Sequence, residues 1–357
     1  MPLFQQLCEV NASFKREFSP ARAKWLTRHF PLIVLEHCQG QGPEAYEPRG
    51  PAGYRPRKGY IDGHYIAAAA ELKRLNRSTT ILYYQNMDAA LPFFRYSSNI
   101  AMHPKWRVSG RGSTGGSMFP NLTTYIWDHS NDEVQRTFLS TFLNLTDAGS
   151  PLDGTFVDTA EGEAPAGRAE ILARMQSMRP NKLVGFHTAD IPSTYSLTQI
   201  YNFDASESKI DWLRRIATSP TIALVHAQTA FGTCEQCGHV HSALAAFLIG
   251  AGERSYFAFS AIGDAGGPGS AGWEFCAPHS PADPIFPTWC TGMGWSDDFL
   301  RPLGPPLANA ERSAGGIWRR RFATGTNVSV DTGMGECRID WAVGPATVCA
   351  PFVTVDW

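Results

Sequence analysis

Two aspartates, each placed directly after a short apolar run, are the residues of this sequence best suited to chemistry. Asp158 follows residues 154–157, and Asp204 follows residues 200–203. Cleavage of a glycosidic bond needs two carboxyl groups, because one protonates the leaving oxygen while the other attacks the anomeric carbon or activates water. We therefore expect Asp158 and Asp204 to face each other across a sugar.

Polar or ionisable residues also end most of the other apolar runs. If the runs are parallel strands of one barrel, their carboxyl ends meet at a single mouth, where such folds carry their active sites. The residues expected to bind substrate there are Glu36, Tyr84, Asn86, Trp127, Asp128, Glu161, His187, His226 and Gln228. Glu161, Glu163 and Glu207 compete for the catalytic roles, with Glu36 as a further candidate. Taken singly, each of these residues could equally be a cap or turn residue.

The elements that must position these side chains follow from the apolar patterns. Strands are predicted at residues 30–35, 79–84, 123–127, 154–158, 182–186, 200–203, 221–225 and 255–260. Helices are predicted at residues 20–29, 61–76, 130–145, 167–179, 209–217 and 241–250. Strands that alternate with helices indicate an α/β fold, here a (β/α)8 TIM barrel over residues 1–300. Alternating stretches at 317–322, 326–330 and 346–348 predict a small C-terminal antiparallel β appendage over residues 301–357.

Three segments carry a resemblance to known proteins. The strand ends 83–86 and 154–158, and the tail 301–307 followed by 318–322, resemble uncharacterised glycoside-hydrolase-like TIM barrels. Aspartates after strands four and six are also distantly similar to the α-galactosidase clan. That resemblance implies that Asp158 is the nucleophile and Asp204 the acid/base. The chain departs from the clan at Phe156, where the clan has a lysine.

Composition limits the possible partners. The chain has 357 residues, of which 43% are hydrophobic and 18% charged, and a formal net charge of -2. Such a balance gives no electrostatic reason to expect nucleic acid or an anionic membrane. No apolar run approaches the ~20 residues of a membrane span. We expect a carbohydrate substrate and no cofactor, metal, nucleic acid or membrane partner.

The cysteines and sequons favour a secreted or extracellular protein. The sequence contains 8 cysteines, and their spacing suggests the pairs 276–290, 337–349 and 8–38. Sequons occur at Asn11, Asn76, Asn121, Asn144 and Asn327. Residues 1–7 lack the basic start and long apolar stretch of a signal peptide.

Two alternatives to a glycosidase remain open from the residues. Cys234, Cys237, His239 and His241 are all possible zinc ligands, although a local disulfide between the two cysteines is favoured. A zinc site here would make the chain a zinc-dependent hydrolase. The second alternative is a non-catalytic barrel that binds carbohydrate. Glycine-rich runs at 109–116 and 263–269 lack the strand–glycine–helix context of a phosphate-binding loop.

Overall fold

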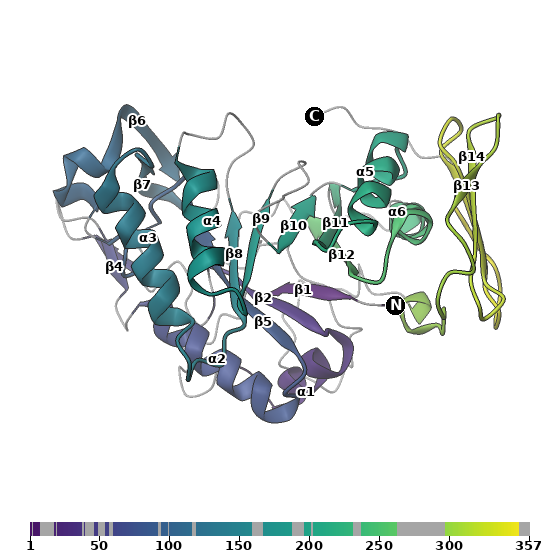
Figure 1. The fold of residues 1–357 in the computed structure, drawn as a ribbon, viewed down its shortest axis with the longest axis horizontal. Coiled ribbons are helices and arrows are strands. Elements are labelled where there is room, and N and C mark those ends of the chain that lie inside the picture. Colours follow the sequence, from purple (N-terminus) through teal and green to yellow (C-terminus); the bar gives the residue numbers. More distant parts are fainter. Residues whose placement is uncertain are drawn as a thin grey trace.

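An eight-stranded parallel sheet forms the centre of the protein in the computed structural model (Figure 1). The structure describes residues 1, 3–7, 18, 20–37, 39, 46–48, 54–56, 60–91, 94–98, 100–115, 119–158, 167–187, 196–200, 203–230, 237–262 and 297–349. Within these ranges, side chains are described except at 4–7, 46–48, 54–56, 109–115, 119–124, 228–230, 237–239 and 260–262.

The strands of this sheet follow one another around it in chain order. They are β1 (Phe4–Leu7), β2 (Leu32–Leu35), β5 (Thr80–Asn86), β8 (Gly154–Asp158), β9 (Leu183–His187), β10 (Leu197–Ile200), β11 (Ile222–Ala230) and β12 (Ser255–Ile262). Each neighbouring pair is parallel. A parallel bridge between Leu3 and Phe257 joins the first strand to the last. The predicted TIM barrel is therefore confirmed.

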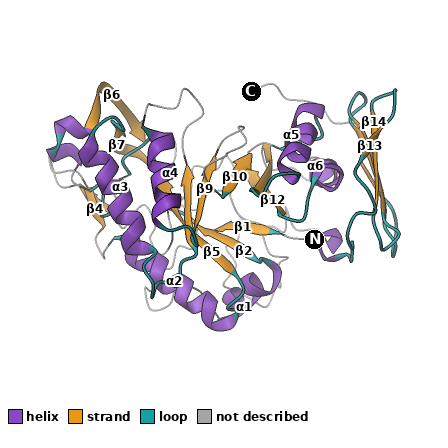
Figure 2. Cartoon of the chain, in the orientation of Figure 1, coloured by secondary structure: helices purple, strands orange, loops and turns teal. Residues whose placement is uncertain are grey.

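Helices lie outside the sheet, in the connections between its strands (Figure 2). They are α1 (Pro20–His29), α2 (Ile61–Leu75), α3 (Asp132–Leu145), α4 (Arg168–Met178), α5 (Glu207–Ala217) and α6 (Cys237–Gly250). Each buries an apolar stripe against the sheet or a neighbouring helix, as α3 does with Val134, Phe138 and Phe142 at four-residue spacing. The side chain of Asn131 caps α3, because its oxygen accepts the Glu133 backbone N–H at 2.8 Å.

Two strand predictions need correction. Residues 123–127 are not the third barrel strand: they belong to β7 (Phe119–Trp127), which pairs antiparallel with β6 (Arg107–Gly115). Alternating β-branched and aromatic residues suit either kind of pairing, so the pattern could not distinguish them. The sixth strand ends at Ile200 rather than at residue 203. Because β1 was not predicted and takes the first place in the ring, Asp158 still ends the fourth strand.

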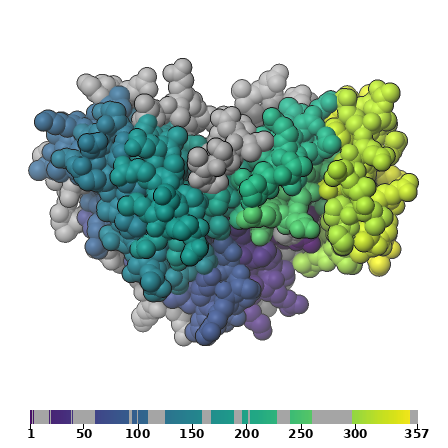
Figure 3. Space-filling model, in the orientation of Figure 1, coloured from purple at the N-terminus to yellow at the C-terminus, as the bar shows by residue number. Residues whose placement is uncertain are grey.

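The C-terminal antiparallel sheet is confirmed. Its order is β13 (Glu311–Arg312), β14 (Ile317–Arg321), β15 (Asn327–Asp331), β16 (Glu336–Asp340) and β17 (Thr347–Cys349). The sheet forms one end of the molecule, opposite the β6–β7 hairpin, and packs beside α5 and α6 (Figure 3). Its buried residues belong to the same hydrophobic cluster as those of α1, α2, α5 and α6, whereas α3 and α4 pack in a second cluster. A domain boundary at residue 300 stays a prediction.

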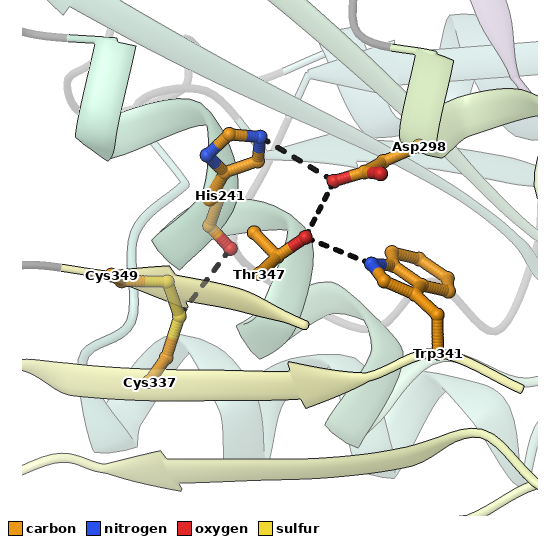
Figure 4. Close-up of a disulfide and its surroundings, with 6 residues drawn as sticks. All are labelled: His241, Asp298, Cys337, Trp341, Thr347 and Cys349. Atoms are coloured by element: carbon orange, nitrogen blue, oxygen red, sulfur yellow. Dashed lines mark hydrogen bonds and ion pairs between the residues drawn. A yellow bond between two sulfur atoms is a disulfide. The ribbon is translucent and has the colours of Figure 1, made fainter. Parts of the chain in front are cut away.

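A polar network joins this sheet to α6 (Figure 4). Asp298 accepts hydrogen bonds from Arg301 Nε at 2.5 Å and from the Thr347 hydroxyl at 2.7 Å. Its carboxylate also lies 3.5 Å from His241 Nε2, and the Trp341 indole N–H donates to Thr347 at 2.8 Å. The predicted disulfide between residues 337 and 349 is confirmed; it links β16 to β17 beside this network. The remaining predicted cysteine pairs lie outside the described residues.

The smaller elements complete the described fold. Strands β3 (Tyr46–Pro48) and β4 (Tyr54–Pro56) pair antiparallel. Short 3-10 turns occur at η3 (Ile100–Met102), η4 (Pro104–Trp106) and η6 (Asp297–Leu300). Among the helices in the described ranges, none is long and apolar enough to cross a membrane.

Candidate active site

The two faces of the barrel sheet can be told apart by their ring contacts. Tyr83 of β5 packs against Tyr65 of α2, with ring centroids 5.8 Å apart. Phe257 of β12 packs against Phe247 of α6 at 5.2 Å. These residues face the helices, and successive side chains of a strand point to opposite faces. Tyr84 therefore points into the barrel.

The pairing register places a set of polar residues on this inner face. Asn86 pairs with Asp158, and Val157 pairs with Phe186, so His187 lies beside Asp158. Leu35 pairs with Tyr83, so the residues that follow them, Glu36 and Tyr84, lie side by side on the inner face. The inner-face set at the carboxyl end of the sheet is Glu36, Tyr84, Asn86, Asp158, His187, Gln199 and His226. The predicted site residues at the ends of five strands, β2, β5, β8, β9 and β11, therefore converge.

Asp158 is at the centre of this set. The Tyr84 hydroxyl donates a hydrogen bond to Asp158 Oδ2 at 2.7 Å. On the other side, His187 Nδ1 lies 3.9 Å from Asp158 Oδ1. The side chain of Asp158 is 26% exposed, whereas that of His187 is 10% exposed. Asp158 therefore presents a carboxylate that is oriented by neighbouring strands and remains partly open to solvent.

Tyr84 is held as a neutral donor. Burial raises the pKa of Tyr84 well above its ordinary value, and the negative charges of Asp158 and Glu36 raise it further. The ring of His37 lies 5.3 Å from that of Tyr84, and His37 Nδ1 lies 3.4 Å from the Glu36 carboxylate. A second carboxyl group, Glu36, therefore lies close to the same phenol.

His226 supports the cluster from inside the barrel. It lies within β11 rather than after it, because this strand continues to Ala230, and it is fully buried. Burial lowers the pKa of His226 to about 3, and the proximity of His187 lowers it too. His226 is consequently neutral at ordinary pH.

Asp204 has a different environment from Asp158. It lies four positions after β10, which ends at Ile200. One oxygen accepts the Ser206 backbone N–H at 2.9 Å, and the other accepts from Lys209 Nζ at 2.8 Å. Both contacts are local: Ser206 is the N-cap residue of α5, and Lys209 lies in its first turn, so Asp204 forms an Asx turn just before the helix. A position facing Asp158 stays a prediction.

The other predicted substrate-binding residues are dispersed. Trp127 is fully buried and packs edge-on against Phe138 of α3 at 5.3 Å, so it belongs to the core. Asp128 accepts the Ser130 backbone N–H at 3.0 Å in the turn before α3. Glu161 and Glu163 lie outside the described residues, as does the side chain of Gln228. Glu207 pairs with Arg312 of the C-terminal sheet at 2.7 Å.

Two inner-face neighbours were not among the predicted site residues. His37 contacts Glu36 and Tyr84, and Gln199 pairs in register with His187 while fully buried. Gln199 could be placed on the inner face only from the pairing register, because the two-residue alternation runs along a single strand and does not align neighbouring strands. His37 directly follows Glu36 after the same strand, so the strand-end pattern that marked Glu36 could have found it as well.

The proposed zinc ligands are only partly described. His241 lies near Asp298, as given above, whereas residue 234 and the side chains of Cys237 and His239 lie outside the described part. Within the described residues, no group of three or more histidine, cysteine, aspartate or glutamate side chains could hold a metal ion.

Comparison with known proteins agrees with the barrel. No family model matches the sequence. A cyclic α-maltosyl-(1→6)-maltose hydrolase from Arthrobacter globiformis is similar in structure, with a TM-score of 0.51 and 12% identity over 98% of this chain and 97% of that one. An α-amylase from Lactobacillus plantarum has a TM-score of 0.52 and 12% identity, and the match covers 95% of this chain and 90% of the amylase chain. At such low identity these likenesses show the fold alone, which is a TIM barrel.

A weaker similarity exists in sequence. Beta-mannosidase A from Aspergillus flavus is 26% identical over 185 residues, which are 50% of this chain. Beta-mannosidase A from Aspergillus oryzae gives the same values. The match spans only 19% of the length of either mannosidase.

Proposed function

We propose that this chain is a glycoside hydrolase that cleaves a glycosidic bond in an oligo- or polysaccharide, with Asp158 as nucleophile and Asp204 as acid/base. The observation that carries the proposal is the setting of Asp158. Its carboxylate ends the fourth barrel strand, accepts from Tyr84 at 2.7 Å and is flanked by His187. In barrels of this class the carboxyl ends of the strands bear the catalytic residues.

The reaction has two displacements. An oxygen of Asp158 attacks the anomeric carbon while the bond to the leaving oxygen breaks, and the acid supplies the proton that this oxygen takes up. Water then attacks the glycosyl ester, giving its proton to the same acid/base group. Asp204 fills that role in the proposal, which requires its contacts with Ser206 and Lys209 to open or to lie within reach of the sugar.

The comparisons guide the choice of substrates. By their names, the proteins compared above are a hydrolase of cyclic α-maltosyl-(1→6)-maltose, an α-amylase and a β-mannosidase. A type III pullulan hydrolase from Thermococcus kodakarensis also shares the fold, with a TM-score of 0.52 and 10% identity over 98% of this chain and 74% of that one. A first panel therefore consists of maltooligosaccharides, pullulan and β-manno-oligosaccharides.

The test compares the wild-type protein with Asp158→Asn and Asp204→Asn. Loss of the nucleophile is expected to lower kcat by about 10⁴-fold or more. Asp147→Asn is the matched control, because Asp147 lies in an exposed turn and an asparagine oxygen can still accept the Gly149 N–H. Wild-type activity in the Asp158→Asn protein would contradict the proposal.

Three other results identify an alternative. Turnover that survives Asp204→Asn assigns the proton donor to one of the competing glutamates. Ligand binding without turnover by the wild-type protein supports a non-catalytic carbohydrate-binding barrel. Activity that is lost on chelation and restored by zinc supports the zinc-dependent hydrolase.

We also propose that the protein acts outside the cell in polysaccharide degradation. The disulfide between Cys337 and Cys349 supports this location, since such bonds persist in oxidising compartments. Recovery of the intact chain from the culture medium of its source tests the proposal, and recovery only from cell lysate contradicts it.

A further inference from the structure

The side-chain amide of Asn86 makes hydrogen bonds through both of its ends. Its Oδ1 accepts the backbone N–H groups of Asp88 at 2.9 Å and of Ala89 at 2.7 Å. An amide nitrogen could not accept these bonds, so the two backbone donors fix the orientation of the group. The opposite end, Nδ2, donates to the Tyr84 hydroxyl oxygen at 2.8 Å.

The orientation of Asn86 determines where Tyr84 can donate. A phenol has one proton, and its oxygen already accepts from Asn86. The Tyr84 proton is therefore directed to Asp158 Oδ2, 2.7 Å away. Tyr84 is only 4% exposed, and its backbone carbonyl accepts from Tyr65 at 3.4 Å, which further fixes its position.

We propose that Asn86 is a positioning residue for Asp158: it sets the direction of the Tyr84 hydrogen bond that orients the carboxylate. This role uses Oδ1 and one of the two Nδ2 protons of Asn86, so the expected hydrogen bond to a substrate hydroxyl would have to come from the other proton. The chain of hydrogen bonds runs from the backbone N–H groups to Asn86, then to Tyr84, then to Asp158. The effect of this chain of hydrogen bonds on turnover rests on the proposed glycosidase function, whereas the direction of the hydrogen bonds does not.

The substitution Asn86→Asp tests the direction of donation. An aspartate can still accept both backbone N–H groups, but its other oxygen would face the phenol as a second acceptor. It would then compete with Asp158 for the single Tyr84 proton. Tyr84→Phe removes the same donor while keeping the ring, so the two variants should impair Asp158 in the same way.

The kinetic test is a double-mutant cycle. Tyr84→Phe is expected to lower kcat about tenfold to a hundredfold with little change in KM, the range for losing a hydrogen bond to a charged group. Asn86→Asp should lower kcat by a similar factor alone, but several-fold less in the Tyr84→Phe background. That residual effect measures the added charge. Equal effects in both backgrounds would overturn the proposal, because Asn86 would then act independently of Tyr84.

A second measurement does not depend on activity. Carbon-13 spectra of aspartate-labelled protein follow ionisation of Asp158, whose signal is assigned by its loss in Asp158→Asn. Removing a donor to the ionised carboxylate should raise the pKa of Asp158 in Tyr84→Phe. The pKa of Asp158 should also rise when Asn86→Asp is introduced into the wild-type protein. The same substitution should raise this pKa by less when it is introduced into the Tyr84→Phe protein. An unchanged pKa in Tyr84→Phe overturns the proposal, whereas the expected shifts without any turnover contradict only the glycosidase function.

Discussion

Replacement of Arg320 by methionine should loosen the attachment of the C-terminal sheet to the barrel. Arg320 lies on β14, and its Nη1 approaches three carbonyl oxygens at the end of α6: those of Leu248 at 3.0 Å, Ile249 at 3.2 Å and Ala251 at 2.6 Å. A cation at this place also interacts favourably with the helix dipole. The guanidinium group thus caps α6 from another element.

The expected magnitude follows from the donors available. One guanidinium nitrogen carries two protons, so at most two of the three carbonyls receive a good hydrogen bond at a time. Hydrogen bonds involving a charged group contribute about 1.5–3 kcal/mol each, and the dipole about 0.3–1 kcal/mol. Burial lowers the pKa of Arg320, with Arg214 adding to this, and the desolvation cost offsets part of the gain. We expect a net loss of about 2–3 kcal/mol in the free energy of unfolding.

Urea denaturation followed by fluorescence measures this loss, with Arg319→Met as the matched control. Arg319 is the preceding residue of the same strand and is exposed on the opposite face, so its substitution should cost less than about 0.5 kcal/mol. Both substitutions keep an unbranched side chain and remove one positive charge. Equal changes in the two variants would refute the capping role and leave only a general effect of charge.

Two further predictions concern stability. Replacing both Cys337 and Cys349 with serine should lower the free energy of unfolding by about 3 kcal/mol, because the disulfide closes a loop of sequence separation 12. A reductant should destabilise the wild-type protein but not this variant, and the midpoints of urea denaturation measure both effects. Burial lowers the pKa of His129 to about 4. An unfolded histidine titrates near 6.5, so between about pH 6.5 and pH 4 the unfolded state takes up a proton that the native state does not. The contribution of His129 to the free energy of unfolding should therefore be constant above about pH 6.5. Towards pH 4 it should fall by up to about 1.4 kcal/mol per pH unit. His129→Asn should flatten this fall, whereas the exposed His103→Asn should not; equal pH slopes in the two variants would contradict the assignment.

The barrel could be predicted because most of its strands are buried on both faces. Residues 32–35 and 81–84 are continuous apolar runs and are fully or almost fully buried. Strand β1 escaped detection because its sequence, Phe-Gln-Gln-Leu, contains two glutamines and shows no apolar run. Residues 123–127 were misplaced because an apolar run carries no information about the direction of its partner.

The candidate site could be predicted less completely than the fold. Sequence reasoning placed Asp158 correctly at a strand end, because the run before it stops at a charged residue. It could not see that Trp127 turns into the core, since burial of an aromatic depends on which helix packs beside it. The role of Asn86 was also hidden, because it depends on backbone N–H groups at 88 and 89 whose direction only the folded turn fixes.

The two aspartates differ in how their surroundings are determined. Asp158 is the last residue of its strand, so the pairing register of β5 and β9 determines its neighbours. Asp204 lies four positions after the end of β10, and its carboxylate contacts Lys209 of the helix that follows it. A rigid strand therefore brings Asp158 to groups that are distant in sequence, whereas Asp204 finds local partners. The proposed role of Asp158 therefore rests on the hydrogen bonds that surround it, and not on the spacing of the two acids.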